Sequence, residues 1–562
     1  MNKTKNLLQS GLMALFLFPS FCLRAQTISD HFFGVNAWMP DTIGDVNACI
    51  DPPCIRYGKI HLNWQKVKDS KASIIRYGGI GPDKNMPTNY QYIRMIDSIR
   101  ANGMEPVIQV PFYNYRYTAQ QAAAIVQYVN ITRGRNVKYW IVANEPNFSY
   151  SYTTAAQIAA YFRPFASAMK GVDPGILIIG PEIAGFKVAI TNGLTTPGGP
   201  DDITGRDANG NYYLDIYSFH TYPMGDGSQS TRQLLISDLT SPGDFQDDLA
   251  YLSGRLSACD TYHNRTGTAK LKMAVTETNV NHTNPANDDL YGVGANSFIG
   301  GQFVAEIYGI GMKQGVDFIN LWSAIEGGNS IPDNCGYIDP NTGNKKPLYY
   351  HFWLMAEHFK GASVNCTLNQ PNMKAFASKD GQEISVMIMN QELILNHNYT
   401  VRLNMNSVSG NNPLKINVNA GVAAEFSDAI AAQSTVLLTF NLAGIITKKC
   451  EYSLYAHAVS NLPPSCTQYI TTGVSENETE ASMMVYPNPS PGHFTIELAA
   501  RPEASLTIEV HNMLGQAIYS RDATFDDGSE TVSLDERTPA GIYLLYVRSS
   551  DAVLTQKILV TK

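Results

Sequence analysis

Between residues 26 and 362, short apolar runs rich in β-branched residues alternate with longer stretches of helical spacing. Such alternation is typical of repeated βα units, in which helices connect and cover parallel strands. Eight runs are predicted to be strands: Phe32–Ala37, Ser73–Tyr77, Pro106–Pro111, Val137–Ala143, Ile176–Gly180, Leu214–Phe219, Lys272–Thr276 and Phe318–Trp322. Eight such strands predict a (β/α)8 TIM barrel of the α/β class. The usual size of about 250 residues leaves room here for long loops.

The stretches between these runs support the barrel. Ala119–Asn130, Ala155–Lys170 and Phe298–Gln314 have the apolar spacing of helices, and Pro347–Lys360 is predicted to be the last barrel helix. A doubly wound open sheet is the alternative. No glycine-rich G-x-G-x-x-G turn follows the first predicted strand, which favours the barrel.

The N-terminal residues 1–25 have the pattern of a secretory signal peptide. Lys3 and Lys5 precede an apolar run over Leu12–Phe18. This run is much shorter than the roughly 20 residues that a membrane-spanning helix needs. We therefore predict an exported chain without a membrane span.

After the barrel (26–362), residues 363–447 are predicted to form a β-sandwich accessory domain. Glu383–Met389 and Ser434–Phe440 alternate apolar with polar residues, as strands with one buried face do. Residues 448–475, which contain Pro463 and Pro464, are predicted to be a linker.

The last segment, 476–562, contains short β-rich runs separated by turn residues. Five elements occur in order: Tyr486–Ser490 (YPNPS), Gly492–Phe494, Asn512–Gln516 (NMLGQ), Thr538–Leu545 (TPAGIYLL) and Lys557–Lys562. Over residues 483–562 this set resembles the C-terminal sorting domain of the type IX secretion system. The resemblance implies export through that machinery, to the cell surface or the medium. An ordinary β-sandwich binding module is the alternative.

Cysteine usage agrees with export. The close pairs Cys49/Cys54 and Cys450/Cys466 are candidates for disulfides that close short loops. No cysteine pair has the spacing of a metal site, so we predict no structural metal.

The net charge limits the partners of the chain. Lys and Arg number 41 against 49 Asp and Glu, which gives −8 at pH 7. A chain with this balance lacks the basic field that concentrates nucleic acid, so nucleic acid is not an expected partner.

Two carboxylates follow predicted strands at the face where TIM barrels hold their reacting groups. Asn144 and Glu145 follow the fourth strand, and Glu277 follows the seventh. Hydrolysis of a glycosidic bond needs such a pair, because one group protonates the leaving oxygen while the other attacks the sugar or activates water. A chance surface loop is the alternative for Asn144-Glu145-Pro146 taken alone.

The two strand ends together resemble clan A of the retaining glycoside hydrolases, including its arabinofuranosidases, xylosidases and glucuronidases. The resemblance implies that Glu145 is the acid/base and Glu277 the nucleophile, and that Asn144 contacts the 2-hydroxyl of the sugar. It extends over about residues 26–447, since several families of this clan append a β-sandwich to the barrel.

Four further residues match the same pattern. Arg76 ends the second strand and resembles the arginine that supports the nucleophile. His220 and Tyr222 follow the sixth strand, where a phenol that donates to Glu277 would favour its ionised form. Trp322 ends the eighth strand and resembles an aromatic floor under the sugar. A salt bridge for Arg76, a core role for His220 and Tyr222, and simple packing for Trp322 stay open.

Other polar and aromatic residues near strand ends are weaker candidates for substrate contact. They are Asn36, Trp38, His282, Glu326 and the run Tyr113–Tyr117, for which a solvated Tyr-rich loop is the alternative. Gln109 in the third strand and Glu182 after the fifth match no motif that gives them a role.

The sequence thus predicts a secreted retaining glycoside hydrolase that acts on a polysaccharide or oligosaccharide by double displacement and needs no cofactor. A non-catalytic surface glycan-binding protein on a TIM-barrel scaffold is the alternative from another class, and a structural adhesin is a third. The sequence does not choose the sugar or the linkage.

Overall fold

The computed structural model describes residues 26–37, 59–326, 335–404, 414–469, 483–498, 505–512, 515–525, 528–549 and 553–561. The chain divides into two compact units, Met1–Thr471 and Thr472–Lys562, and each unit is described by itself. None of the helices in the described ranges combines the length and the apolar character needed to cross a bilayer. The predicted signal peptide, Trp38 and the Cys49/Cys54 pair lie outside the described residues.

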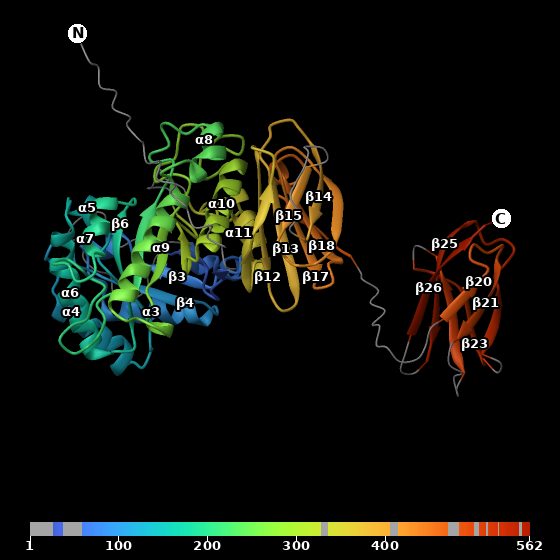
Figure 1. The fold of residues 1–562 in the computed structure, drawn as a ribbon, viewed down its shortest axis with the longest axis horizontal. Coiled ribbons are helices and arrows are strands. Elements are labelled where there is room, and N and C mark those ends of the chain that lie inside the picture. The colour runs from blue at the N-terminus through green and yellow to red at the C-terminus, as the bar shows by residue number, and fades with distance from the viewer. Residues whose placement is uncertain are drawn as a thin grey trace, which may run out of the picture. The chain divides into compact units, whose positions relative to one another are not determined.

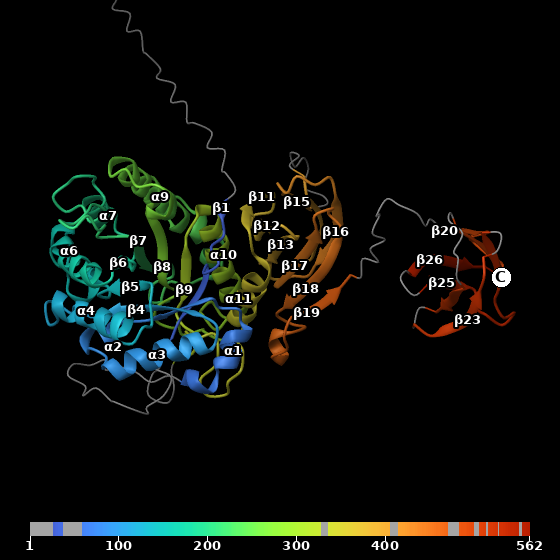
Figure 2. The ribbon, with the colours of Figure 1, turned by 90° about the horizontal axis from the view of Figure 1, so that it is seen from below.

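The first unit contains a closed barrel of eight parallel strands (Figures 1 and 2). In chain order these strands are β2 (Phe33–Asn36), β3 (Ile74–Tyr77), β4 (Glu105–Val110), β5 (Tyr139–Val142), β6 (Leu177–Ala184), β7 (Ile216–Thr221), β8 (Lys272–Thr278) and β9 (Phe318–Leu321). Each of the eight predicted strands overlaps one of them, so the predicted (β/α)8 TIM barrel is confirmed.

Helices connect the strands and cover the outside of the barrel (Figure 2). They are η1 (Lys59–Leu62), α1 (Trp64–Asp69), α2 (Ile80–Lys84), α3 (Asn89–Ala101), α4 (Ala119–Val126), η2 (Gln127–Thr132), α5 (Pro146–Ser149), α6 (Ala155–Val172), α7 (Val188–Leu194), α8 (Arg232–Ser237), η3 (Asp238–Thr240), α9 (Phe245–Tyr262), η4 (Gly267–Ala269), α10 (Phe298–Gln314) and α11 (Pro347–His358). Local sequence signals favour these helices. At the start of α6, for example, the Thr154 side chain accepts from the Gln157 N–H in a capping box, which satisfies a backbone donor at the helix end.

The barrel interior is filled by an apolar layer to which every strand except β2 contributes. Ile74, Ile216 and Ala274 belong to this layer, together with Val107, Tyr139, Ile141, Ile179 and Phe318. Side chains two residues apart in a strand point to the same side. Arg76, two residues after Ile74, and Ser218, two residues after Ile216, therefore also point inward, one layer closer to the C-terminal mouth.

A seven-stranded and a four-stranded sheet follow the barrel and share one hydrophobic core, as the predicted β-sandwich requires (Figure 1). The larger sheet has the order β1 (Gln26–Thr27), β10 (Ala362–Val364), β12 (Met373–Lys379), β13 (Glu383–Asn390), β17 (Ser434–Asn441), β18 (Ile446–Ser453) and β19 (Ser465–Gln468). The smaller has the order β11 (Cys366–Leu368), β15 (Leu414–Val418), β14 (His397–Arg402) and β16 (Glu425–Ile430).

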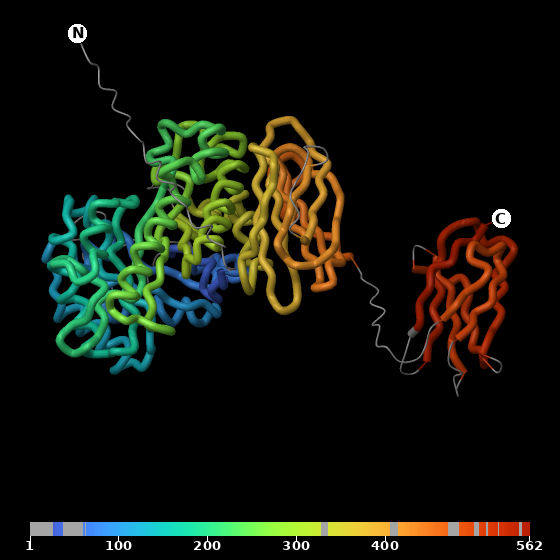
Figure 3. Tube along the Cα trace, viewed as in Figure 1, coloured from blue at the N-terminus to red at the C-terminus, as the bar shows by residue number. Residues whose placement is uncertain are grey.

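The sandwich is fixed to the barrel through α10 and α11. The Gln302 amide on α10 donates to the Ser434 carbonyl at 3.1 Å, and His351 Nε2 on α11 lies 2.9 Å from Thr435 Oγ1. Figure 3 follows the chain from the barrel into the adjoining strands. Residues 26 and 27 precede the barrel in sequence but pair with β10, so they belong to the sandwich sheet.

The linker prediction for residues 448–475 is wrong for its first part. β18 pairs with β17, β19 pairs with β18, and a short helix, η5 (Ala458–Ser460), lies between them. Cys450 and Tyr452 alternate with more exposed residues and are buried, which is the period-two pattern of an outer strand. The predicted Cys450–Cys466 disulfide is present and joins these two strands. Residues 470–475 lie outside the described residues.

The second unit consists of two small antiparallel sheets around their own core. One has the order β20 (Met483–Tyr486), β21 (His493–Leu498) and β24 (Ser529–Ser533). The other has the order β23 (Ala517–Ala523), β22 (Leu506–His511), β25 (Gly541–Arg548) and β26 (Val553–Val560). The predicted C-terminal β-sandwich is confirmed.

Candidate active site

The polar residues predicted from the strand ends come together at the C-terminal mouth of the barrel. One oxygen of Glu145 and one oxygen of Glu277 lie within 4.8 Å of each other, and His220 offers a ring nitrogen within the same distance of both. Retaining glycosidases separate their two carboxyl groups by about 5 to 5.5 Å, whereas inverting enzymes leave about 6.5 to 9.5 Å for a water molecule. The nearest oxygens of Glu145 and Glu277 are closer together than either of these separations.

Glu145 owes its position to an unusual turn directly after β5. Its backbone has φ 46° and ψ 57°, a left-handed conformation that is uncommon outside glycine. Pro146 then begins α5 at the first helical position, where the missing N–H of proline costs nothing. The Glu145 N–H donates to the Glu182 carbonyl at 2.9 Å, which anchors the turn to β6. The Glu145 side chain remains partly exposed at the mouth.

Glu277 is placed by a β-bulge. The ladder between β7 and β8 shifts between Phe219 and His220, and the ladder between β8 and β9 shifts beyond Val275. Successive side chains of a regular strand point to opposite faces. Here both Thr276 and Glu277 reach groups inside the barrel, because the bulge inserts one residue and turns Glu277 inward.

Arg76 is completely buried and holds the nearby polar groups in place. Its Nη1 donates to Glu277 Oε1 at 2.7 Å and to Asn36 Oδ1 at 2.9 Å. Its Nη2 donates to Asn144 Oδ1 at 2.9 Å and to Glu182 Oε2 at 3.0 Å. A guanidinium presents donors in a planar fork, so one side chain aligns residues from four other strand ends.

Glu182 lies at the centre of this network, beneath the mouth. Its Oε1 accepts from Ser218 Oγ at 2.5 Å and from Thr276 Oγ1 at 2.6 Å, and its Oε2 accepts from Arg76. Burial by itself would raise the pKa of the Glu182 carboxyl, but the Arg76 charge and the His220 contact lower it to about 2. Glu182 is therefore a buried anion at neutral pH.

His220 bridges three carboxylates. Its Nδ1 lies 2.9 Å from Glu145 Oε1 and 3.5 Å from Glu277 Oε2, and its Nε2 lies 3.0 Å from Glu182 Oε2. Burial opposes the charged ring, but the Glu277 charge and the contacts to Glu145 and Glu182 raise the pKa of His220 to about 10. The ring is an imidazolium at neutral pH, and both nitrogens donate.

Tyr222 completes the surroundings of Glu277. Its hydroxyl donates to Glu277 Oε2 at 3.1 Å. Burial, together with the Glu277 charge, raises the pKa of Tyr222 well above its usual value, so the phenol stays a donor. Burial also raises the pKa of the Glu277 carboxyl, while the His220 and Arg76 charges act in the opposite direction.

The amide of Asn144 is oriented by Arg76. A guanidinium can only donate, so the atom that faces Arg76 is Oδ1, and the Nδ2 group takes the other position. Asn36 serves the same network, because its Nδ2 donates to the Thr276 carbonyl at 3.0 Å. Asn36 is buried and holds Arg76, so it is a support of the network.

Trp322 lies at the end of β9 against Gly79. The Trp322 ring approaches Gly79 so closely that an added Cβ would lie 3.3 Å from Cη2, and Gly79 has φ +106°. The Gln109 side-chain oxygen holds Gly79 in place by accepting a hydrogen bond from its N–H at 2.7 Å. The indole N–H donates to Glu326 Oε1 at 3.0 Å, so Glu326 orients the ring.

His282 is exposed, and its ring packs edge-on against Tyr222 at 6.0 Å between centroids.

Glu182 is the residue whose importance the sequence did not reveal. Its partners Ser218 and Thr276 are 36 and 94 residues away along the chain. The only local signal was a carboxylate just after an apolar run, which Glu145 and Glu277 share.

Glu145, His220 and Glu277 have a spacing that could hold a metal ion. A metal needs a neutral imidazole nitrogen with a lone pair. Here both His220 nitrogens face carboxylates, and the raised pKa keeps the ring protonated. This donor set fits an ion-pair network better than a metal site.

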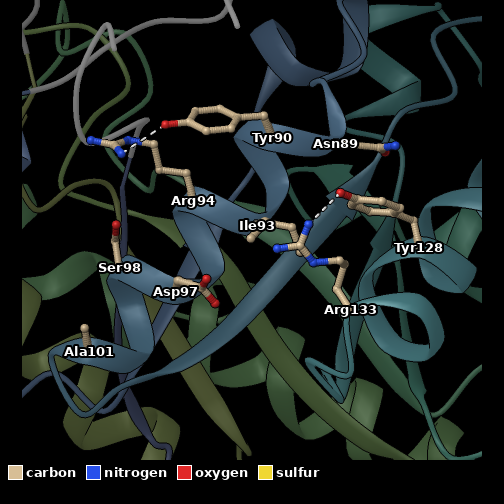
Figure 4. A pocket seen from close by; sticks show the side chains of 9 residues that line it. All are labelled: Asn89, Tyr90, Ile93, Arg94, Asp97, Ser98, Ala101, Tyr128 and Arg133. Carbon is tan, nitrogen blue, oxygen red and sulfur yellow. Dashed lines mark hydrogen bonds between the residues drawn. The ribbon is translucent and has the colours of Figure 1, made fainter. Parts of the chain in front are cut away.

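A separate pocket of about 600 Å³ lies on the outer surface along α3 and η2 (Figure 4). Tyr90 pairs with Arg94 and Tyr128 pairs with Arg133 along its walls. Its one carboxylate, Asp97, binds Arg135. None of the predicted site residues lines this pocket, so it is unrelated to the cluster at the mouth.

The C-terminal unit matches a known family. The family described as "Secretion system C-terminal sorting domain" matches residues 484–561. The predicted type IX sorting domain is thereby confirmed, and the chain is exported to the cell surface or the medium. No curated protein sequence matches the chain.

Solved structures resemble this chain over about three quarters of its length. CelM2, a bifunctional glucanase-xylanase from a metagenome library, is 16% identical over 74% of this chain and 97% of that chain, with a TM-score of 0.50. A Paenibacillus polymyxa xyloglucanase from glycoside hydrolase family 44 is 13% identical over 74% and 97%, with a TM-score of 0.49. AbfB, a family 51 α-L-arabinofuranosidase from Bifidobacterium longum, is 16% identical over 75% and 95%, with a TM-score of 0.48. At this identity the likeness to CelM2 shows a shared fold.

Proposed function

We propose that this exported protein is a retaining glycoside hydrolase that cleaves a polysaccharide or oligosaccharide by double displacement. The observation that carries the proposal is the approach of Glu145 and Glu277, within 4.8 Å, at the C-terminal mouth of the barrel. That spacing allows one carboxylate to attack the sugar directly, because no water molecule has to fit between the sugar and the attacking group.

In the first step a Glu277 oxygen attacks the anomeric carbon and forms a covalent bond to it. The bond between that carbon and the leaving oxygen breaks, and its electron pair stays on the oxygen, which takes the proton of Glu145. Glu277 suits the attack because Arg76 and Tyr222 fix its two oxygens. Glu145 suits proton transfer because its side chain is partly exposed at the mouth.

In the second step Glu145 removes a proton from water, and the water oxygen attacks the anomeric carbon. The bond to Glu277 breaks, and its electron pair returns to the carboxylate. Two successive inversions leave the product with the configuration of the substrate. The same residue acts as acid and then as base, as microscopic reversibility requires.

The residues around the pair support this chemistry in distinct ways. Arg76 binds the Asn144 carbonyl oxygen, which aims the Asn144 amide nitrogen for donation to the 2-hydroxyl of the sugar. Trp322 provides an aromatic floor for the sugar ring. The charged His220 ring next to Glu145 and Glu277 compensates the negative charge that two close carboxylates concentrate.

The first experiment identifies the sugar and tests the stereochemistry. Glucans, xylans, arabinans and matching aryl glycosides are screened by reducing-sugar release, and the first-formed anomer is read by NMR. Retention of configuration supports the proposal. Inversion, or no hydrolysis of any compound in the panel, would overturn it.

The second experiment locates the nucleophile. The 2-deoxy-2-fluoro glycosyl fluoride of the sugar found in the screen should accumulate as a covalent adduct, and peptide mass spectrometry should find it on Glu277. Glu277→Gln is the matched control and should take no label. A label on another residue would contradict the assignment.

A further inference from the structure

The loop after β4 has a backbone that few sequences adopt. Tyr113, Asn114 and Tyr115 have φ values of 33°, 52° and 64°, so three successive residues other than glycine are left-handed. Each such residue costs about 1 kcal/mol or more and persists only when its surroundings enforce it. Residues of this kind gather at ligand sites, which makes the loop a candidate for binding.

Contacts to the segment after Glu145 enforce this conformation. The Tyr152 hydroxyl donates to Asn114 Oδ1 at 2.8 Å, and the Tyr113 and Tyr150 rings meet edge to face at 5.6 Å. Tyr150 caps α5, the short helix that begins immediately after Glu145. The loop and the proposed acid/base are therefore parts of one packed structure.

Two aromatic rings of this structure are exposed. Tyr115 is 60% exposed and Phe148 is 77% exposed. Phe148 lies one turn from Glu145, because its N–H donates to the Glu145 carbonyl at 3.0 Å. Tyr115 is braced by Phe112, whose ring lies 4.8 Å away edge to face. Both rings thus stand on fixed backbone: Phe148 is one turn from the proposed acid/base, and Tyr115 is on the loop that packs against the segment following it.

We propose that Tyr115 and Phe148 form a second sugar subsite, which binds a sugar unit next to the one that reacts. The inference rests on the proposed function for the identity of its ligand. A sugar ring carries C–H groups on its faces and hydroxyls at its edge. Rigid aromatic rings remove the apolar face from water at small cost in conformational entropy, and the Tyr115 hydroxyl can bind a sugar hydroxyl.

The consequence is a preference for chains over single sugars. A sugar at the reacting position contacts the network around Glu277, and only a longer substrate also reaches the two exposed rings. Removing either ring should therefore weaken binding of oligosaccharides and leave monosaccharide binding unchanged. Losing part of the aromatic surface that a bound sugar would cover corresponds to about a tenfold decrease in affinity.

The test measures binding separately from hydrolysis. Isothermal titration gives Kd values of the full chain for xylohexaose, cellohexaose and arabinohexaose and for the corresponding monosaccharides, in a Glu277→Gln background that prevents turnover. Tyr115→Ala and Phe148→Ala are compared with Tyr262→Ala, an equally exposed tyrosine at the end of α9. That end precedes β8 and so lies at the opposite face of the barrel.

We expect the hexasaccharide Kd to rise about tenfold in Tyr115→Ala and Phe148→Ala but not in Tyr262→Ala, with monosaccharide Kd unchanged. An unchanged hexasaccharide Kd in both variants, or no hexasaccharide binding by the parent protein, would overturn the subsite. If hexasaccharides bind with the expected pattern but the native protein hydrolyses none, the subsite is supported and the proposed hydrolase function fails.

Discussion

His220 Nε2 lies 3.0 Å from Glu182 Oε2, while Nδ1 of the same ring lies 2.9 Å from Glu145 Oε1. One imidazolium therefore connects a fully buried anion to the carboxylate at the mouth. The buried partner adds to the effect of Glu277 and Glu145 in keeping the ring charged, and the ring in turn donates to the carboxylate that is proposed to transfer protons. A residue that touches no substrate can in this way control the pH range of the site.

Replacing Glu182 by Gln should shift the alkaline side of the pH–activity profile. Glu182 helps to raise the pKa of His220 to about 10, so the variant should lose the ring proton at lower pH. We expect the alkaline limb of kcat/KM to move toward neutral pH, with about a tenfold loss at pH 8 and a smaller loss at pH 5.5. Ser218→Ala removes one hydrogen bond but leaves the Glu182 charge, so it should shift the limb less. An unmoved limb in the Gln variant would contradict this role.

Tyr222→Phe should slow the covalent step. The variant loses the hydrogen bond from the Tyr222 hydroxyl to Glu277 Oε2, which orients the proposed nucleophile and favours its charged form. A hydrogen bond to a charged group is worth about 1.5 to 3 kcal/mol, so kcat should fall by about 10- to 100-fold with little change in KM. Steady-state kinetics on an aryl glycoside measure both values. A change in KM alone would assign Tyr222 to binding.

Glu145→Ala should be rescued by a small anion. Without the acid/base, substrates with sugar leaving groups should lose about 100- to 10,000-fold in rate, whereas dinitrophenyl glycosides need no protonation and should still form the glycosyl-enzyme. Azide should then restore turnover and give a glycosyl azide with the substrate's configuration, detected by NMR. Glu277→Ala is the control, because an azide that attacks there would give the opposite anomer.

The disulfide should stabilise the unit formed by the barrel and the sandwich. The Cys450–Cys466 bond closes a loop with a sequence separation of 16, for which chain entropy gives about 3 kcal/mol. The double variant Cys450→Ala/Cys466→Ala should therefore unfold in urea with about this much less free energy. A reducing agent should destabilise the parent protein by about this much more than it destabilises the double variant, which retains the candidate pair Cys49/Cys54. Equal stability with and without reductant would show that the bond adds nothing.

The sequence was sufficient for the barrel because each strand is a local apolar run, and the runs that precede Glu145 and Glu277 end in carboxylates. It was insufficient for the inner network. Thr276 and Glu277 are adjacent, and a regular strand would send them to opposite faces. The β-bulge that brings both inside depends on pairing with β7 and β9, which no local pattern reveals.

Two other errors have related causes. The linker prediction weighed Pro463 and Pro464 more than the alternation around Cys450, and it missed β19, an edge strand whose residues are all exposed. Glu182 was left without a role because its function depends on hydrogen-bond partners that come from β3, β7 and β8. Such long-range convergence is a property of the closed barrel.

Asp83→Asn should change how stability depends on pH. Asp83 is fully buried on α2 and accepts from the Phe112 N–H at 3.0 Å and from the Tyr150 hydroxyl, so it joins the loop after β4 to the segment that follows Glu145. Burial raises the pKa of Asp83 to about 7, although these hydrogen bonds act in the opposite direction. In the unfolded chain the group titrates near pH 4.

The direction of this pH dependence follows from the protons that the folded and unfolded states bind. Between about pH 4 and pH 7 the folded protein keeps the Asp83 proton that the unfolded chain releases, so rising pH lowers the free energy of unfolding across this window. Asn cannot titrate, and it can keep both contacts, because its Oδ1 accepts from the Phe112 N–H while its Nδ2 donates to the Tyr150 hydroxyl. The difference in unfolding free energy between the parent protein and Asp83→Asn should therefore change by about 4 kcal/mol from pH 4 to pH 7.5, in favour of the variant. Urea titrations at both pH values measure it. A difference that stays constant would show that Asp83 is ionised in the folded protein throughout, and that its hydrogen bonds outweigh its burial.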